Sequence, residues 1–308
     1  MKKIILFIAL IPCVIFSQEI TTEEYKLKNG EIQLPGTLTY PESNEKVPLI
    51  IFIHGSGNVD RNGNQAGANI KAGYIKMLSE KLNAKGVGFY RYDKRTATVA
   101  NLQLSTNILL SDFVSDAQVA INTFKNDERF SKLILIGHSQ GSLVAMLSIT
   151  ADIDGYVSLA GPAESIDKTI VKQLSAQSAE MGKVGAEHFK ELIQTDTILQ
   201  VNPLLISVFH PRNQKFFKSW AMIAPTNEIK KVKIPTLILN GDADLQVNVE
   251  DANKLKVANT NAELHIIPKM NHLLKVVNSP TENQQSYFDV SFPLSEQLVK
   301  LIVDFVNK

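Results

Sequence analysis

Hydrophobic positions in this chain follow two alternating patterns. Short, mostly apolar runs occur at 48–53, 87–92, 133–136, 156–159, 236–240 and 264–267, and those at 48–53 and 133–136 are unbroken. Between them, apolar residues recur every three or four positions over 70–84, 110–124, 142–149, 249–257 and 294–306. Unbroken apolar runs are typical of strands covered on both faces, and the wider spacing is typical of amphipathic helices. Strands separated by helices predict crossover connections, so we expect an α/β fold with a mostly parallel central sheet and helices on both faces.

Two regions depart from this alternation. Near the start, 23–27 and 32–34 alternate around Asn29-Gly30, which predicts an antiparallel hairpin, and a further extended piece ends at Pro41. From 163 to 229 the apolar runs give way to helical spacing, over the segments 166–181, 186–193, 203–209 and 216–223. Because this insertion follows a strand, we expect either a packing subdomain or a helical cap over a site. The sequence contains no internal repeat or low-complexity linker, which favours one domain over 18–308 with the insertion inside it.

The first 17 residues have a different composition. Two lysines precede an apolar run from Ile4 to Phe16, and the small residue Ser17 follows it. This pattern predicts a secretory signal peptide cleaved after Ser17, and hence an exported protein that is periplasmic or secreted. The run is too short for a stable transmembrane span, and Pro12 also argues against an uncleaved membrane anchor. Cys13, the only cysteine, lies inside the signal, so the mature chain should contain no disulfide or thiol chemistry.

Composition narrows the functional classes further. The chain has 308 residues, of which 44% are hydrophobic and 20% charged, with a formal net charge of +1. This balance is typical of a globular protein and provides no electrostatic reason to expect nucleic acid or anionic membrane as a partner. No cluster with metal-ligand spacing and no Gly-rich phosphate loop is present in the sequence. We therefore expect neither a metal nor a cofactor.

The candidate chemistry is concentrated at the ends of the expected strands. Gly137-His138-Ser139-Gln140-Gly141 lies between an apolar run and a helical segment, which is the setting of a nucleophile elbow. In such a turn the serine is held in a strained backbone conformation, and glycines two residues away on either side avoid collisions. Ser139 is therefore the candidate nucleophile.

A serine nucleophile needs a base and an acid, which in this arrangement follow it in the order acid, then histidine. The strand ending at Asn240 leads into Asp242 and Asp244, and the strand ending at Ile267 leads to His272. We favour Asp244, because Asp242 directly follows a glycine and is typical of a turn residue. We favour His272 over His265, which lies within a strand. For the remaining histidines, we expect packing or surface roles at 188 and 210 and a variable elbow position at 138.

An oxyanion formed by serine attack needs two backbone N–H donors. One comes from the residue after the nucleophile, here Gln140, and the other from the loop after an earlier strand. That loop is His54-Gly55-Ser56-Gly57, and its most suitable donor is Ser56. The alternative interpretation is that this loop is only a Gly-rich turn after a strand. The presence of the nucleophile elbow in the same chain disfavours that alternative.

These motifs resemble bacterial α/β-hydrolases of the carboxylesterase or acyl-esterase type. The resemblance rests on the segments described above and on two further ones, 60–64 and 91–95, and it covers nearly all of the mature chain. It implies a Ser-Asp-His esterase with a helical cap and no cofactor. The chain departs from the pattern at Thr96-Ala97-Thr98, where such relatives usually have a small glycine-containing turn. For the charged residues Asp60, Arg61, Asp93 and Arg95 we favour a role in locking loops together over substrate contact.

The sequence leaves several functions open. Hydrolysis of a small-molecule ester is preferred, while a serine peptidase or a thioesterase could use the same triad. A peptidase that binds a free amine would need a buried carboxylate, for which Glu164 and Glu187 are available. A non-catalytic exported binding protein is disfavoured, because serine, acid and histidine are all present. Within the insertion, Trp220 is a candidate substrate contact, although aromatic residues at helical spacing more often belong to a core.

Overall fold

The computed structural model describes residues 19–308, so the expected signal peptide and Cys13 lie outside the described residues. Eight strands form one sheet in the order β1-β2-β6-β3-β7-β8-β9-β10. The strands β3 (Val47–Ile53), β6 (Gly88–Tyr92), β7 (Phe130–His138), β8 (Gly155–Leu159), β9 (Thr236–Gly241) and β10 (Glu263–Ile267) are parallel to one another. The mostly parallel sheet predicted from the apolar runs is confirmed.

The first two strands form a long hairpin at the edge of the sheet. β1 (Ile20–Asn29) pairs antiparallel with β2 (Ile32–Pro41), which pairs antiparallel with β6. Asn29 pairs with Ile32, so the two loop residues are Gly30 and Glu31, and Gly30 has φ 60°. The two-residue turn therefore lies one residue later in the chain than the Asn29-Gly30 turn that we expected.

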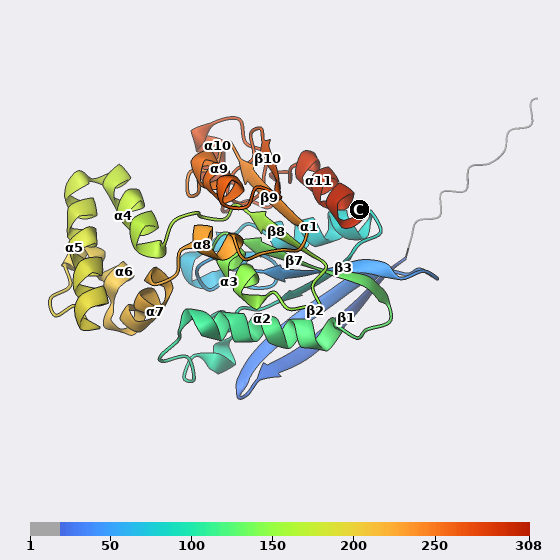
Figure 1. The fold of residues 1–308 in the computed structure, drawn as a ribbon, viewed down its shortest axis with the longest axis horizontal. Coiled ribbons are helices and arrows are strands. Elements are labelled where there is room, and N and C mark those ends of the chain that lie inside the picture. The colour runs from blue at the N-terminus through green and yellow to red at the C-terminus, as the bar shows by residue number, and fades with distance from the viewer. Residues whose placement is uncertain (1–18) are drawn as a thin grey trace, which may run out of the picture.

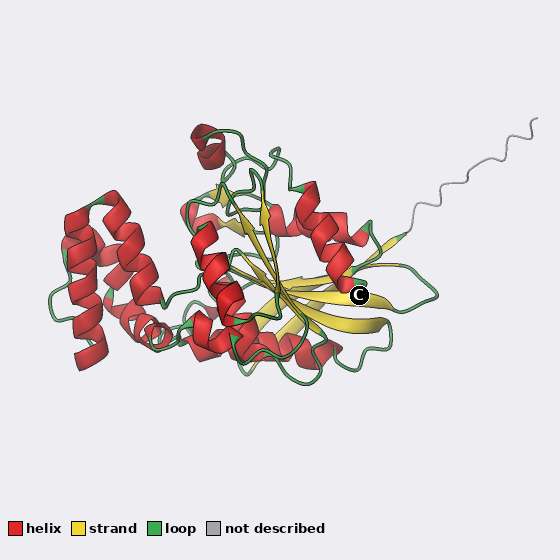
Figure 2. Ribbon diagram, turned by 45° about the horizontal axis from the view of Figure 1, so that its top comes forward, coloured by secondary structure: helices red, strands yellow, loops and turns green. Residues whose placement is uncertain are grey.

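Helices cover both faces of the sheet, as Figures 1 and 2 show. One face packs α2 (Leu110–Phe124), α3 (Gln140–Ser148), α8 (Pro225–Ile229) and α9 (Val249–Ala258), and the other packs α1 (Tyr74–Asn83) and α11 (Glu296–Val306). In β3, Leu49 and Ile51 point into the first core, while Ile50 and Phe52 point into the second. Burial on both faces explains why the strand is continuously apolar.

The segment between β8 and β9 is helical. It contains α4 (Ile166–Gln177), α5 (Ala179–Thr195), a short 3₁₀ turn (Pro203–Leu205), α6 (Ile206–Phe209), α7 (Pro211–Ala221) and α8. In Figure 1, α4 to α7 lie beside the sheet as a separate layer. This layer has a small core of its own, made by Leu174, Phe189, Leu192, Ile198, Leu205 and Phe209. The two ends of the segment, at Ile166 and Ile229, are instead buried in the main core.

Several predicted boundaries were wrong. The helix expected from residue 70 begins at Tyr74, because Gly73 has φ 62°, and residues 70–71 form the short strand β5 (Ile70–Lys71) opposite β4 (Asn64–Gln65). The single helix expected over 166–181 ends at Gln177, and the Ser178 hydroxyl accepts a hydrogen bond from the Met181 amide to begin α5. The short helix α10 (Pro280–Gln285) has no counterpart among the predicted elements. Over residues 19–308, no helix combines the length and apolar character needed to cross a bilayer.

Candidate active site

The turn between β7 and α3 holds Ser139 in an unusual conformation, with φ 54° and ψ −122°. The chain is too crowded here for side chains on the flanking glycines. A Cβ on Gly137 would lie 2.2 Å from the carbonyl oxygen of Gly141, and a Cβ on Gly141 would lie 2.2 Å from that of Ile53. Both contacts are with backbone, which cannot swing away, so both glycines are required. This is the geometry that the Gly-x-Ser-x-Gly pattern predicts.

Asp244 and His272 meet beside this turn. Asp244 Oδ2 lies 2.8 Å from His272 Nδ1, and the two side chains are 0% and 6% exposed. The other carboxylate oxygen of Asp244 accepts hydrogen bonds from the amides of Gln246 and Val247, at 2.8 and 2.9 Å. Because a carboxylate accepts, Nδ1 carries the proton and Nε2 is left with its lone pair. His272 and Ser139 line the same cavity.

The structure separates these residues from their rivals. Asp242 is exposed, and its carboxylate accepts a hydrogen bond from the Lys269 amide at 2.6 Å, which joins the loop after β9 to the loop after β10. His265 lies in β10, where its partly exposed ring is 4.0 Å from Glu263. The structure therefore brings Asp244 to His272 and leaves the other two candidates outside the cavity.

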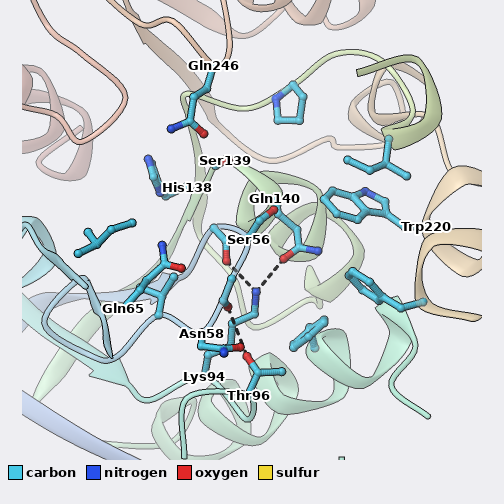
Figure 3. A pocket seen from close by; sticks show the side chains of 18 of the residues that line it. Ser56, Asn58, Gln65, Lys94, Thr96, His138, Ser139, Gln140, Trp220 and Gln246 are labelled. Atoms are coloured by element: carbon cyan, nitrogen blue, oxygen red, sulfur yellow. Dashed lines mark hydrogen bonds between the residues drawn. The ribbon is translucent and has the colours of Figure 1, made fainter. Parts of the chain in front are cut away.

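The two expected oxyanion donors face the same space. Gln140 is the first residue of α3, and the first amides of a helix have no partner within it. The Ser56 residue lies in the exposed loop after β3, and both residues line the cavity together with Ser139 (Figure 3). Ser56 and Gln140 therefore both border the space next to the serine.

His138 has a role that its sequence position did not reveal. Its Nε2 lies 2.8 Å from the backbone carbonyl of His272, and its Nδ1 lies 3.2 Å from the Tyr74 hydroxyl. Because a carbonyl can only accept, Nε2 donates and Nδ1 accepts. Burial, with a contribution from the nearby His272, lowers the pKa of His138 to about 3 and keeps the ring neutral. We expected a variable position here, but His138 fastens the His272 loop to the elbow.

A cavity of about 790 Å³ opens above the serine. The main domain and the helical layer both contribute apolar walls, which include Ile70, Leu102, Ile108, Phe113, Ile166, Ile170, Phe216, Phe217, Trp220 and Leu273. Trp220 is 4% exposed, and its ring is stacked on that of Phe217 with centroids 6.4 Å apart. Trp220 therefore belongs both to the main core and to the cavity wall.

The charged residues of the 60–95 region are engaged with one another. The Arg61 guanidinium donates to both carboxylate oxygens of Asp93, at 3.0 and 2.9 Å. Arg95 makes the same kind of pair with Asp116, with both bonds at 2.7 Å. The Asp60 carboxylate accepts from amides within its own loop. These contacts are those of residues that lock loops together, the role that we preferred from the sequence.

The remaining candidates lie away from the cavity. Glu164 forms an ion pair with Lys254 at 3.0 Å, and Glu187 is exposed on α5. His188 accepts a hydrogen bond from the Asn202 amide, and His210 accepts one from the Arg212 amide at the start of α7. Within residues 19–308, no group of three or more histidine, cysteine or acidic side chains is arranged to hold a metal ion.

Known proteins resemble this chain in sequence and in fold. Esterase EstD of Thermotoga maritima is 24% identical over 245 residues, which are 78% of this chain and 58% of that protein. The chain thus spans little more than half of that curated relative. Est1E from Butyrivibrio proteoclasticus superposes with a TM-score of 0.58 at 18% identity, covering 92% of this chain and 99% of the other. For the Pyrococcus furiosus esterase Pf2001 the TM-score is 0.57 at 20% identity, with 94% and 91% covered.

These structural likenesses confirm the α/β-hydrolase fold that the sequence predicts. The family model described as "Serine aminopeptidase, S33" matches residues 66–276, which include the elbow, Asp244 and His272. The match extends over more than half of the chain, and the chain belongs to this S33 family of α/β-hydrolases.

Proposed function

We propose that this chain hydrolyses carboxylic esters through an acyl-serine intermediate. The observation that carries the proposal is the Asp244–His272 hydrogen bond of 2.8 Å, which leaves the second ring nitrogen of His272 free beside Ser139. That arrangement is a base oriented by an acid next to a strained, half-buried serine. The name of the sequence relative, an esterase, supports the same activity.

The proposed reaction has two halves. In the first, Ser139 Oγ attacks the acyl carbon while His272 Nε2 takes the hydroxyl proton, and the Ser56 and Gln140 amides hold the resulting oxyanion. The C–O bond to the alcohol then breaks, and the alcohol leaves with the proton from His272. In the second half, water loses a proton to His272 and attacks the acyl-serine. Collapse of the second tetrahedral intermediate returns the proton to Ser139 and releases the carboxylic acid.

The cavity favours an ester over a substrate with a free amino terminus. Among the described residues that line it, none is aspartate or glutamate, while Lys94 and Arg212 contribute positive charge. A free ammonium group would find no counter-ion there, and burying it unpaired would be costly. The carboxylates that we considered for such a role, Glu164 and Glu187, do not line the cavity. We therefore place aminopeptidase activity second, although the family description names it.

The cap should determine the acyl group. We propose that the helical segment 163–229 is a cap over the acyl site and that Trp220 contacts the substrate, since it lines the apolar part of the cavity. Fatty or aromatic acyl chains fit such a wall, because each methylene removed from water contributes about 0.8 kcal/mol.

Labelling and turnover test this function directly. A fluorophosphonate should form an adduct on Ser139 at neutral pH, identified by mass spectrometry of the labelled peptide. Turnover is then compared on p-nitrophenyl esters, thioesters and aminoacyl amides, and esters should be the best substrates. No adduct on Ser139 would overturn the serine mechanism, and a clear preference for aminoacyl amides would reverse the order of the two activities.

We also propose that the protein is exported. The support is the lysine pair and apolar run before Ser17 in the sequence. Expression of the full chain in a bacterial host, followed by N-terminal mass analysis of the periplasmic fraction, should give a mature chain starting at Gln18. A chain that keeps its first 17 residues in the membrane fraction would instead indicate an anchor.

A further inference from the structure

One buried cation touches the oxyanion loop and has no place in the reaction described above. Lys94 follows β6 and is 5% exposed. Its Nζ donates to the Gly55 carbonyl at 2.7 Å and to Gln140 Oε1 at 2.8 Å, and it lies 4.4 Å from the centre of the Phe113 ring. Figure 3 shows Lys94 among the residues that line the cavity, with both hydrogen bonds drawn.

One acceptor belongs to the peptide group that supplies the first oxyanion donor, and the other belongs to the residue that supplies the second. The Gly55 carbonyl and the Ser56 N–H are the two ends of one peptide group. A cation bonded to the carbonyl oxygen draws electron density toward it, which makes the N–H at the other end a stronger donor. The second acceptor is the side chain of Gln140, whose backbone N–H is the other donor. One ammonium group therefore connects both halves of the oxyanion site.

Lys94 also fixes this loop through its backbone. Its amide donates to the carbonyl of Val59 at 3.2 Å, while Thr96 Oγ1 donates to that of Gly57 at 3.3 Å. Residues 55–59 are thus held at three points by the segment 94–96. A preorganised donor requires this kind of support, because the N–H must already point at the position of the oxyanion when the charge develops.

We propose that Lys94 is a positioning residue of the oxyanion hole, which aligns the Gly55–Ser56 peptide and Gln140 and polarises the Ser56 amide through its positive charge. This inference rests on the proposed function, since it assigns Lys94 to the same acyl-transfer site.

The surroundings of Lys94 leave it without a carboxylate partner. The titratable groups that face it are His54 at the end of β3, Tyr92 on β6, Asp116 on α2 and its neighbour Arg95. Both oxygens of Asp116 are occupied by Arg95. Burial lowers the pKa of His54 to about 3 and raises that of Tyr92 well above 10, so both are neutral.

Burial also lowers the pKa of Lys94 to about 7, a change that the Asp116 charge only partly opposes. The charged form is the active one in this proposal. The contribution of Lys94 is therefore largest well below pH 7 and falls as the pH rises through that value. Loss of the Lys94 charge therefore predicts a descending limb in the plot of kcat against pH.

The test compares Lys94→Met with the wild-type enzyme on a neutral aryl ester between pH 5.5 and 9.5. We expect kcat to fall by about tenfold at pH 6, less than the 10²–10³-fold for deletion of a whole oxyanion donor, with KM little changed. Affinity for an aryl trifluoromethyl ketone, whose adduct with the serine places an oxyanion in the hole, should fall by the same factor. The descending limb near pH 7 should disappear in the variant.

Two further variants separate charge from structure. Lys94→Gln keeps a neutral donor, so it should lose the descending limb and retain more activity than Lys94→Met. Lys275→Met is the matched control, because Lys275 is also buried and bonds two carbonyls, those of Ser286 and Asp289, but does not line the cavity. It should lower the melting temperature and keep the descending limb. If Lys94→Met does not fold, the comparison of kcat and ketone affinity between Lys94→Gln and the wild type decides the proposal.

Several results would overturn the proposal. Lys94→Met with unchanged kcat and ketone affinity would do so, as would a higher KM alone, which would make Lys94 a substrate contact. A loss of activity that follows the melting temperature in both lysine variants, with the limb retained, would reduce Lys94 to a structural role. Failure of the proposed function looks different, because the wild-type enzyme itself would then neither turn over esters nor bind the ketone.

Discussion

The backbone of Ser139 stores strain that a single pair of substitutions can measure. Its torsions, φ 54° and ψ −122°, are those of the first central residue of a type II′ turn, a position that glycine prefers. A residue with a Cβ held in such a sparsely populated region costs about 1–3 kcal/mol. The hydrophobic core of the fold has to offset that cost, because the hydroxyl must face the cavity.

We expect Ser139→Gly to be more stable than Ser139→Ala. Both variants lose the hydroxyl, so the difference isolates the Cβ. Glycine releases the strain of about 1–3 kcal/mol but makes the unfolded chain more flexible, which costs roughly 0.4–1 kcal/mol. The net gain should be about 1 kcal/mol in the free energy of unfolding, or roughly 2 °C in melting temperature for a domain of this size.

Urea unfolding followed by circular dichroism measures this difference, with the slope m compared to check that the unfolded states are equivalent. The control is Ala145→Gly in α3, where the torsions are helical and glycine should instead destabilise by about 1 kcal/mol. Both Ser139 variants should lose on the order of 10⁴-fold or more in ester turnover. A glycine variant equal to or less stable than the alanine variant, at unchanged m, would refute strain at the elbow.

Two other substitutions test the acid and the cap. Asp244→Asn should reduce kcat far more than Asp242→Asn, because only Asp244 contacts His272 and stabilises its cation; a weaker Asp242 variant, in kinetics on one ester, would reverse the assignment. Trp220→Ala should change the preference between short and long acyl esters by roughly fourfold in kcat/KM per methylene affected. A uniform loss over all chain lengths, with a lower melting temperature, would place Trp220 in packing alone.

The parts of the site that could be predicted from the sequence are those marked by a pattern within a short stretch of chain. The elbow is marked by two glycines within a five-residue motif, although the backbone that crowds Gly141 belongs to Ile53 of β3. Asp244 and His272 were found because each directly follows a strand, and the carboxyl ends of parallel strands meet at one edge of the sheet. Burial on both faces made the central strands visible as apolar runs. In each case the sequence signal lies within one element and the loop after it.

Most of the parts that were missed depend on contacts between residues far apart in the sequence. The hydrogen bond from His138 to the His272 carbonyl joins residues 134 positions apart, and that from Lys94 to Gly55 joins residues 39 apart. Neither pair has a spacing that marks it in the sequence. The break between α4 and α5 was local, but it depends on a single serine cap, Ser178, inside otherwise continuous helical spacing. A cap of this kind is recognised only when the helix boundary is already known.

The side chains that line the cavity come from two parts of the fold, the loops of the sheet and the helical segment, and we propose a different role for each. The residues proposed for chemistry, together with Lys94, come from loops and turns of the sheet, whose positions are fixed by backbone contacts and buried pairs. Much of the apolar wall comes from α4 and α7, which pack around a small core of their own beyond the edge of the sheet. Two of these wall residues, Ile166 of α4 and Trp220 of α7, are also buried in the main core, so α4 and α7 shape the wall while packed against the sheet domain. We infer that substrate range in this chain is set by α4 and α7 and that acyl transfer is set by the sheet.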